Sequence, residues 1–247
     1  MISKLKRLVR RSLARRLQLP EIPVCLNALA QRGYAPSLVF DIGAYEGEFA
    51  KEILNVWPAA HVVCFEPQDH AADRIENFRR TNSRIDLYRC LLGAAVQDAV
   101  DLHICETASS VLEEWHSKHG HQSYRQTTVD DVVEKIYGGR APDLLKLDVQ
   151  GYELQVLMGA EKTLPRVQAI LTEINLLDLH KGVPLFHEVS EWLAKRNFLI
   201  YEICGLTRRP LDGALWRIDA VFVQADGPLR RDKRWQIESV RIGGDRT

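Results

Sequence analysis

The chain has 247 residues, of which 46% are hydrophobic, and its 33 Lys and Arg balance 33 Asp and Glu. This composition suits one α/β domain with a small appendage, and zero net charge argues against a protein built to bind nucleic acid. No apolar run approaches the roughly 18–20 residues of a transmembrane helix, and the N-terminus lacks the apolar h-region of a secretory signal, so we expect a cytoplasmic protein.

The first predicted element is a helix over residues 2–17. Residues 1–19 contain seven Lys or Arg and no acid, and the apolar residues between them recur at helical spacing: Leu5, Leu8, Val9, Leu13 and Leu17. Such a basic amphipathic helix either packs on the domain or a partner, or contacts an anionic membrane surface. The second alternative would place the protein at the inner face of the membrane, beside lipid-linked glycan acceptors.

Strands and helices alternate through the domain predicted over residues 20–224, which a polar tail follows over 225–247. The predicted strands span residues 38–42, 61–67, 85–92, 100–105, 143–149, 169–174, 198–204 and 218–224. The predicted helices span residues 24–32, 47–56, 70–80, 153–164 and 184–196, with another beginning near 129. Residues 106–127 are polar and irregular, and we expect a loop or lid there.

This alternation, with strands apolar on both faces, predicts an α/β fold with a doubly wound, mostly parallel seven-stranded sheet. The last two strands are joined by too short a link for a crossover helix, so we expect an antiparallel strand at the C-terminal end of the sheet.

The stretch LVFDIGAYEGEF, residues 38–49, joins a predicted strand to a helix through a glycine turn that contains acids. Its register is Asp41-x-Gly43-x-x-x-Gly47, so Asp41 stands where the dinucleotide fingerprint G-x-G-x-x-G has its first glycine. A pyrophosphate would be repelled by Asp41, and further by Glu46 and Glu48 if they face it. The turn therefore favours a nucleoside that carries positive charge and no phosphate, as S-adenosylmethionine does.

Glu66 ends the next predicted strand, 23 residues beyond Gly43. An acid about 20 residues past a glycine turn can accept hydrogen bonds from both ribose hydroxyls. The position of Glu66 therefore supports a nucleoside site at the carboxyl ends of these strands.

Five segments, in this order, resemble the FkbM-type S-adenosylmethionine-dependent methyltransferases: FDIGAYEGEFA, VVCFEP, TTVDDVV, DLLKLDVQGYELQVLMGAEKTL and ILTEI. The resemblance covers about residues 38–224, and KLDVQGYE with the later GA is its specific part. It implies a class I, Rossmann-like methyltransferase fold and O-methylation, often of sugar or polyketide hydroxyls. Tyr45 departs from the family, which usually has Asn at this position.

The predicted cofactor-binding residues are Asp41, Gly43, Ala44, Tyr45, Gly47, Glu66, Pro67 and Leu92. Asp148 is the first candidate for the base that accepts the proton of the hydroxyl, and Glu173 is the second. Asp148 could instead orient the cofactor or hold the turn at Gly151, and Glu173 could instead pair with a backbone amide or with Lys146. Glu153, in the first turn of its helix, is interpreted as structural.

The predicted contacts with the acceptor substrate are Gln150, Asn175 and His180, although a lone histidine in a loop is more often solvated. Ser109 and Ser110 open the predicted lid and are weaker candidates. The histidines at 116, 119 and 121 match no standard metal-ligand spacing, and the five cysteines include no Cys-x-x-Cys pair, so no metal site is predicted.

The leading interpretation is an O-methyltransferase acting on a hydroxyl of a small molecule or glycan. Two alternatives stay open: a non-catalytic S-adenosylmethionine-binding or scaffold protein, and an NAD-type oxidoreductase, which Asp41 opposes.

Overall fold

The computed structural model describes residue 17 and residues 19–103, 109–113 and 120–235. The predicted basic helix over residues 2–17 therefore lies outside the described residues except for Leu17, and so do His116 and His119 of the predicted lid. None of the described helices combines the length and apolar composition needed to cross a membrane.

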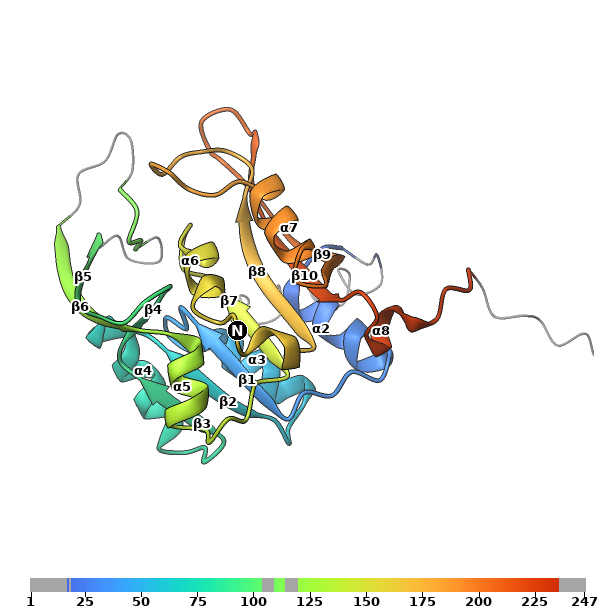
Figure 1. Cartoon of the computed structure of the whole chain (residues 1–247), viewed down its shortest axis with the longest axis horizontal. Helices are drawn as coiled ribbons and strands as arrows, with labels where there is room; N and C mark the ends of the chain where they lie inside the picture. Colours follow the sequence, from blue (N-terminus) through green and yellow to red (C-terminus); the bar gives the residue numbers. More distant parts are fainter. Residues whose placement is uncertain (1–16, 18, 104–108, 114–119, 236–247) are drawn as a thin grey trace, which may run out of the picture.

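The main sheet has seven strands in the order β3-β2-β1-β7-β8-β10-β9 (Figure 1). The first five pair in parallel, and β10 is antiparallel to both β8 and β9. The strands are β1 (Leu38–Ile42), β2 (His61–Phe65), β3 (Ile85–Tyr88), β7 (Leu144–Leu147), β8 (Ala169–Asn175), β9 (Phe198–Arg208) and β10 (Leu215–Gln224). This arrangement confirms the predicted mostly parallel sheet with an antiparallel strand near its C-terminal end.

Helices cover both faces of the main sheet, which explains why its parallel strands are apolar on both sides. Buried side chains of α2 (Ile22–Gln31), α3 (Glu48–Val56) and α4 (Asp69–Arg79) form a core with one face. Those of α5 (Val129–Lys135), α6 (Glu153–Met158) and α7 (Phe186–Ala194) form a core with the other face. Strand order reverses between β1 and β7, so the carboxyl ends of these two strands mark the crevice where α/β sheets bind ligands.

A second, three-stranded sheet was missed by the sequence patterns. It contains β4 (Leu91–Leu92), β5 (Gln97–His103) and β6 (His121–Thr127) in the order β4-β6-β5. The strand predicted over 85–92 is thus two strands in different sheets, and part of the predicted loop at 106–127 is a strand. The side chains of β6 are mostly exposed, so this strand lacks the apolar alternation by which strands are predicted.

The remaining differences concern where elements end. The helix predicted over 153–164 ends at Met158, and a 3₁₀ turn, η2 (Leu164–Arg166), follows it. Strands β9 and β10 extend into the link predicted between them, and α8 (Pro228–Arg231) lies in the predicted polar tail.

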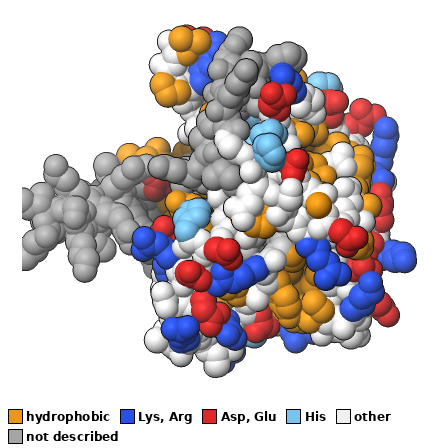
Figure 2. Space-filling view, turned by 90° about the vertical axis from the view of Figure 1, so that its left-hand side faces the viewer, with side chains coloured by type: hydrophobic (Ala, Val, Ile, Leu, Met, Phe, Trp, Pro, Cys, Tyr) orange, Lys and Arg blue, Asp and Glu red, His pale blue; other side chains and the backbone are white. Residues whose placement is uncertain are grey.

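Charges of both signs are interspersed on the face that the second sheet, α4 and α5 form, where apolar side chains lie between them (Figure 2). Several of these charges pair with one another. Arg89 lies 2.8 Å from Asp69 and 2.6 Å from Asp73, and Lys135 lies 2.7 Å from Asp131. Exposed pairs of this kind contribute little to stability.

The glycine of the GA pair that marks the family resemblance, Gly159, follows α6 and packs closely against the second sheet. A Cβ on Gly159 would lie 2.0 Å from the carbonyl oxygen of Gly93, which follows β4. We expect Gly159→Ala to lower the free energy of unfolding by roughly 1–3 kcal/mol, because backbone must move to relieve the overlap. Gly120→Ala is the control, since nothing lies within 4 Å of that position. Equal denaturation midpoints for both variants would contradict this close approach.

Candidate functional site

The chain turns sharply between β1 and α3, at the carboxyl end of the sheet. Gly43, Tyr45 and Gly47 all adopt left-handed backbone conformations, with φ of 75°, 46° and 77°. A Cβ on Gly43 would lie 2.0 Å from the carbonyl oxygen of Asp148, so only glycine lets β1 and β7 meet this closely. The N–H groups of Gly43 and Ala44 donate to the carbonyl of Phe65 and so bind the turn to β2.

Two of the three acids of the turn form ion pairs on the surface. Glu46 lies 3.0 Å from Arg74, and Glu48 lies 2.7 Å from Lys51. Their charges are therefore partly neutralised within the chain. This pairing weakens the expectation that Glu46 and Glu48 add to the repulsion of a phosphate.

Glu66 follows β2 and is buried, with 3% of its surface exposed. Its two carboxylate oxygens each accept a backbone N–H at 2.9 Å, one from Tyr45 and one from Gln68. Burial raises the pKa of Glu66 to about 6, although these donors oppose the shift. Hydrogen bonds thus join the turn to Glu66, and the backbone of Tyr45, the residue that departs from the family, helps to hold this carboxylate in place.

A pocket lies where the ends of β1, β2 and β7 meet the second sheet. Five of the predicted site residues line it together: Gly43, Glu66, Pro67, Leu92 and Asp148. Gln68, Leu91, Leu102, Ser109, Val111, Val149 and Tyr152 complete the lining. Its walls are thus mainly apolar, with carboxylates at two of its edges.

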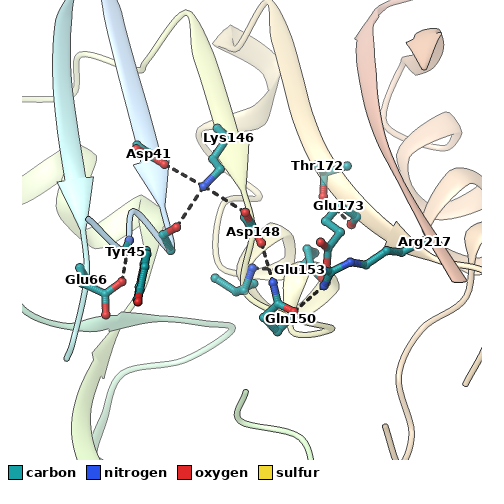
Figure 3. Close-up of polar contacts among 12 residues, drawn as sticks. Asp41, Tyr45, Glu66, Lys146, Asp148, Gln150, Glu153, Thr172, Glu173 and Arg217 are labelled. Carbon is teal, nitrogen blue, oxygen red and sulfur yellow. Dashed lines mark hydrogen bonds and ion pairs between the residues drawn. The ribbon is translucent and has the colours of Figure 1, made fainter. Parts of the chain in front are cut away.

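Lys146, which the sequence analysis mentioned only as a partner, lies at the centre of the polar contacts of the site (Figure 3). Its Nζ lies 3.0 Å from Asp41 Oδ1 and 3.6 Å from Asp148 Oδ2, and it donates to the carbonyl of Gly43 at 3.0 Å. Asp41 is completely buried and is not among the residues that line the pocket. Asp41 therefore lies beneath the turn as a counterion of Lys146.

The titration behaviour of Lys146 follows from this arrangement. Burial alone lowers the pKa of Lys146, but the two carboxylates outweigh it and hold the pKa above its usual value. Burial also raises the pKa of Asp41, and Lys146 opposes that shift. A buried cation thus joins the turn after β1 to the end of β7. A charged residue inside the apolar run LLKL is the sequence signal that could have revealed it.

The polar contacts continue from Asp148 toward β8 and β10. Gln150 donates through Nε2 to Asp148 Oδ1 at 2.8 Å and accepts from Arg217 through Oε1 at 2.5 Å. Arg217 also lies 2.8 Å from Oε1 of Glu173. The predicted residues Asp148, Gln150 and Glu173 are thus brought together in one network (Figure 3).

The turn after β7 is held by Glu153, which accepts the backbone N–H groups of Val149 at 3.0 Å and Gly151 at 3.2 Å. Gln150, between them, has a φ of 53°, which few non-glycine residues adopt. Burial raises the pKa of Glu153 to about 7. These contacts agree with the structural role expected for Glu153 and fix the direction of Gln150.

The other predicted acceptor contacts are buried. Asn175, at the end of β8, and His180, in the loop that follows, are each 2% exposed. His180 is therefore not the solvated loop residue that its sequence context favours. The start of the predicted lid also reaches the site, because the hydroxyl of Ser110 donates to the carbonyl of Gln150 at 2.7 Å.

Arg217 and Asp219 on β10 were not singled out from the sequence. Asp219 pairs with Glu173 in the register of β8 and β10, and Arg217 pairs with Asn175. Their spacing of two within a largely buried strand, LWRIDAVFVQ, places both on one face and is the signal that could have found them.

Comparison with known proteins gives one family and one distant relative of assigned activity. The model of the family described as "Methyltransferase FkbM domain" matches residues 41–200. The 2-O-methyltransferase NoeI of Sinorhizobium fredii is 28% identical over 165 residues, which are 59% of this chain and 66% of NoeI. The chain thus matches slightly less than two thirds of that relative's length.

Among solved structures, methyltransferase FkbM from Methylobacillus flagellatus aligns with a TM-score of 0.51 and 18% identity, over 76% of this chain and 43% of that protein. This similarity concerns the fold alone. A putative RNA methyltransferase, PH1948 from Pyrococcus horikoshii, aligns with a TM-score of 0.45 and 16% identity over 82% of each chain.

The buried position of Lys146 predicts that replacing it destabilises the fold. We expect Lys146→Met to lower the free energy of unfolding by about 3–5 kcal/mol, because it leaves the buried Asp41 charge without its partner. Adding Asp41→Asn should recover more than half of this loss, since no charge is then left unpaired. Urea denaturation of both variants measures the effect, with the exposed Lys51→Met as the control. A double variant as unstable as Lys146→Met would contradict this pairing.

Proposed function

This chain belongs to the FkbM methyltransferase family, and on that premise we propose that it transfers a methyl group from S-adenosylmethionine to a hydroxyl of a glycan or secondary metabolite. The observation that carries the proposal is the pocket in which the glycine turn, Glu66 and Asp148 converge. The name of the relative NoeI, a 2-O-methyltransferase, supports oxygen as the atom that is methylated.

The residues around the pocket fit the parts of S-adenosylmethionine. Glu66 would accept hydrogen bonds from the ribose hydroxyls, because its carboxylate is fixed by Tyr45 and Gln68 and borders the pocket. Leu92 and Leu102 would contact the adenine ring from the second sheet. Gly43 allows the amino-acid part of the cofactor to approach the backbone, and Asp148, which lines the same pocket, would favour its sulfonium and ammonium groups.

Asp148 is the better placed of the two predicted bases. Its side chain is 38% exposed and borders the pocket, whereas the side chain of Glu173 is 6% exposed and pairs with Arg217. Methyl transfer requires the acceptor oxygen, the methyl carbon and the sulfur to lie in line, and binding both substrates in that geometry supplies much of the rate. Asp148 would accept the hydroxyl proton as the C–O bond forms and the methyl C–S bond breaks, which would release S-adenosylhomocysteine. Lys146 and Gln150 would hold the Asp148 carboxylate toward the acceptor.

The first test concerns the cofactor and its dependence on pH. Ribose hydroxyls donate to an ionised Glu66, and its pKa of about 6 means that protonation removes this acceptor below pH 6. The affinity for S-adenosylhomocysteine should therefore be constant above pH 7 and fall by up to about tenfold per pH unit below 6. Calorimetry at pH 5–8 measures it, with NAD as a ligand that should not bind.

In Glu66→Gln the affinity should be lower at pH 7, because a charge-assisted hydrogen bond worth about 1.5–3 kcal/mol is weakened. Its pH dependence should be correspondingly flat. Identical titrations for the variant and the native chain across this range would remove Glu66 from the cofactor site.

The second test separates binding from chemistry. Asp148→Asn keeps the size of the side chain but removes its basicity, so methyl transfer should fall by about 10²–10⁴-fold while cofactor affinity changes little. Transfer of a tritiated methyl group into a cell glycan extract measures turnover. Glu173→Gln should lower methyl transfer less, because Glu173 is buried and pairs with Arg217.

Loss of cofactor affinity and turnover together in Asp148→Asn would assign Asp148 to cofactor orientation. Cofactor binding by the native chain without transfer into any fraction of the extract would favour the non-catalytic alternative.

A further inference from the structure

One row of neighbouring residues crosses the main sheet from β1 to β9. The register pairs Ile42 with Leu147 and Leu147 with Thr172, so the next positions bring together Gly43, Asp148 and Glu173. The row continues through two printed pairs, from Glu173 to Asp219 and from Asp219 to Gly205. Paired residues of adjacent strands share a face, so three carboxylates lie side by side on one face, between two glycines.

The three carboxylates of this row differ in their partners. Asp148 is bound by Gln150 and lies near Lys146, and Glu173 is paired with Arg217. Among the residues that the structure describes, none donates a hydrogen bond to the carboxylate of Asp219 or forms an ion pair with it. Of the three carboxylates in the row, that of Asp219 is therefore the one most available to accept hydrogen bonds from a bound molecule.

Gly205 makes room for this carboxylate. A Cβ at Gly205 would lie 1.8 Å from Oδ2 of Asp219. Glycine inside a strand weakens the strand and commonly marks the close approach of another group. Burial and, to a smaller extent, Asp148 raise the pKa of Asp219 to about 6, against the opposing effect of Arg217. Holding such a carboxylate without a partner costs free energy, which a bound donor would offset.

We propose that Asp219 selects the acceptor by accepting a hydrogen bond from a hydroxyl or ammonium group of a neutral or cationic sugar. The inference rests on the proposed methyl transfer, because Asp148, two strands away in the same row, is the site of the reacting hydroxyl. Two strand spacings are about 9–10 Å, so the acceptor reaches Asp219 through a group other than the one that is methylated.

The same row sets the charge of the acceptor. Arg217, the cation nearest Asp219 along β10, is already engaged by Glu173 and Gln150. An anionic sugar such as a uronate would place its carboxylate beside Asp219 and Glu173, where the nearest described cation, Arg217, is already paired. Like charges at such distances repel, and desolvation strengthens the effect. The site therefore disfavours anionic acceptors.

The test measures binding to the full chain loaded with S-adenosylhomocysteine. The probes are the methyl glycosides of glucose, glucosamine and glucuronic acid, titrated at pH 7.5. The glucoside and the glucosaminide should bind at least tenfold more tightly than the glucuronide. In Asp219→Asn the affinity for the glucosaminide should fall about tenfold or more, because a charge-assisted hydrogen bond is lost.

Asp212→Asn is the matched control, since Asp212 lies at the exposed turn of the same hairpin and pairs with Arg209. It should bind all three probes as the native chain does. Glucuronide binding equal to or tighter than that of the other probes would overturn the proposal, and so would equal glucosaminide affinities of the native chain and Asp219→Asn. Failure of S-adenosylhomocysteine itself to bind would instead overturn the proposed function, and is measured first.

Gly205→Ala gives a second test of the proposal, because it keeps the carboxylate of Asp219 but displaces it. Its added Cβ should lower the thermal midpoint and weaken glucosaminide binding together. Asp219→Ala in the Gly205→Ala background relieves the overlap, so it should restore the midpoint and leave the weak binding unchanged. If restoring the midpoint also restored the affinity, Asp219 would act only through the packing of the hairpin, and the proposal would be wrong.

Discussion

The site depends on one buried cation. Lys146 projects from an apolar strand and binds three groups at once: the carboxylate of Asp41, the carbonyl of Gly43 and, more distantly, the carboxylate of Asp148. Placing a lysine in a protein interior is unfavourable unless its charge is compensated, and here Asp41 on the neighbouring strand β1 and Asp148 just past the end of β7 compensate it. The end of β1, which forms the cofactor turn, is thereby fixed relative to the end of β7, which carries the proposed base.

Two different kinds of interaction shape the two halves of the site. The cofactor half is made mainly by backbone: left-handed residues at the turn, a glycine against the carbonyl of Asp148, and N–H groups that orient Glu66. The acceptor half is made by side chains, which run from Gln150 through Arg217 to Glu173. Backbone contacts tolerate few substitutions, whereas a network of side chains can change its recognition without altering the strands beneath it.

The sequence predicts what local patterns determine. Parallel strands that are buried on both faces give uninterrupted apolar runs, so the main sheet could be predicted from the sequence. The turn after β1 needs glycines at fixed spacing, so the position of Glu66 relative to that turn could be predicted as well. The small sheet was not, because β6 is polar and pairs with strands that contribute few apolar residues. Lys146 and Asp219 escaped notice for a different reason. Their roles arise from contacts between strands distant in the chain: Lys146 on β7 meets Asp41 on β1, and Asp219 lies beside Glu173 because β10 is inserted between β8 and β9.

The limits of the family match agree with this division. The matched residues, 41–200, contain the cofactor turn, Glu66, Lys146 and Asp148, whereas Arg217 and Asp219 lie beyond them on β10. Strand β10 meets the site through the side chains that it places beside β8, and the turn proposed to bind the cofactor lies three strands away, on β1. Substitutions on β10 can therefore alter the group that the acceptor must present without moving the methyl donor. In the proposed function, the chemistry of transfer and the choice of acceptor therefore belong to different strands of one sheet.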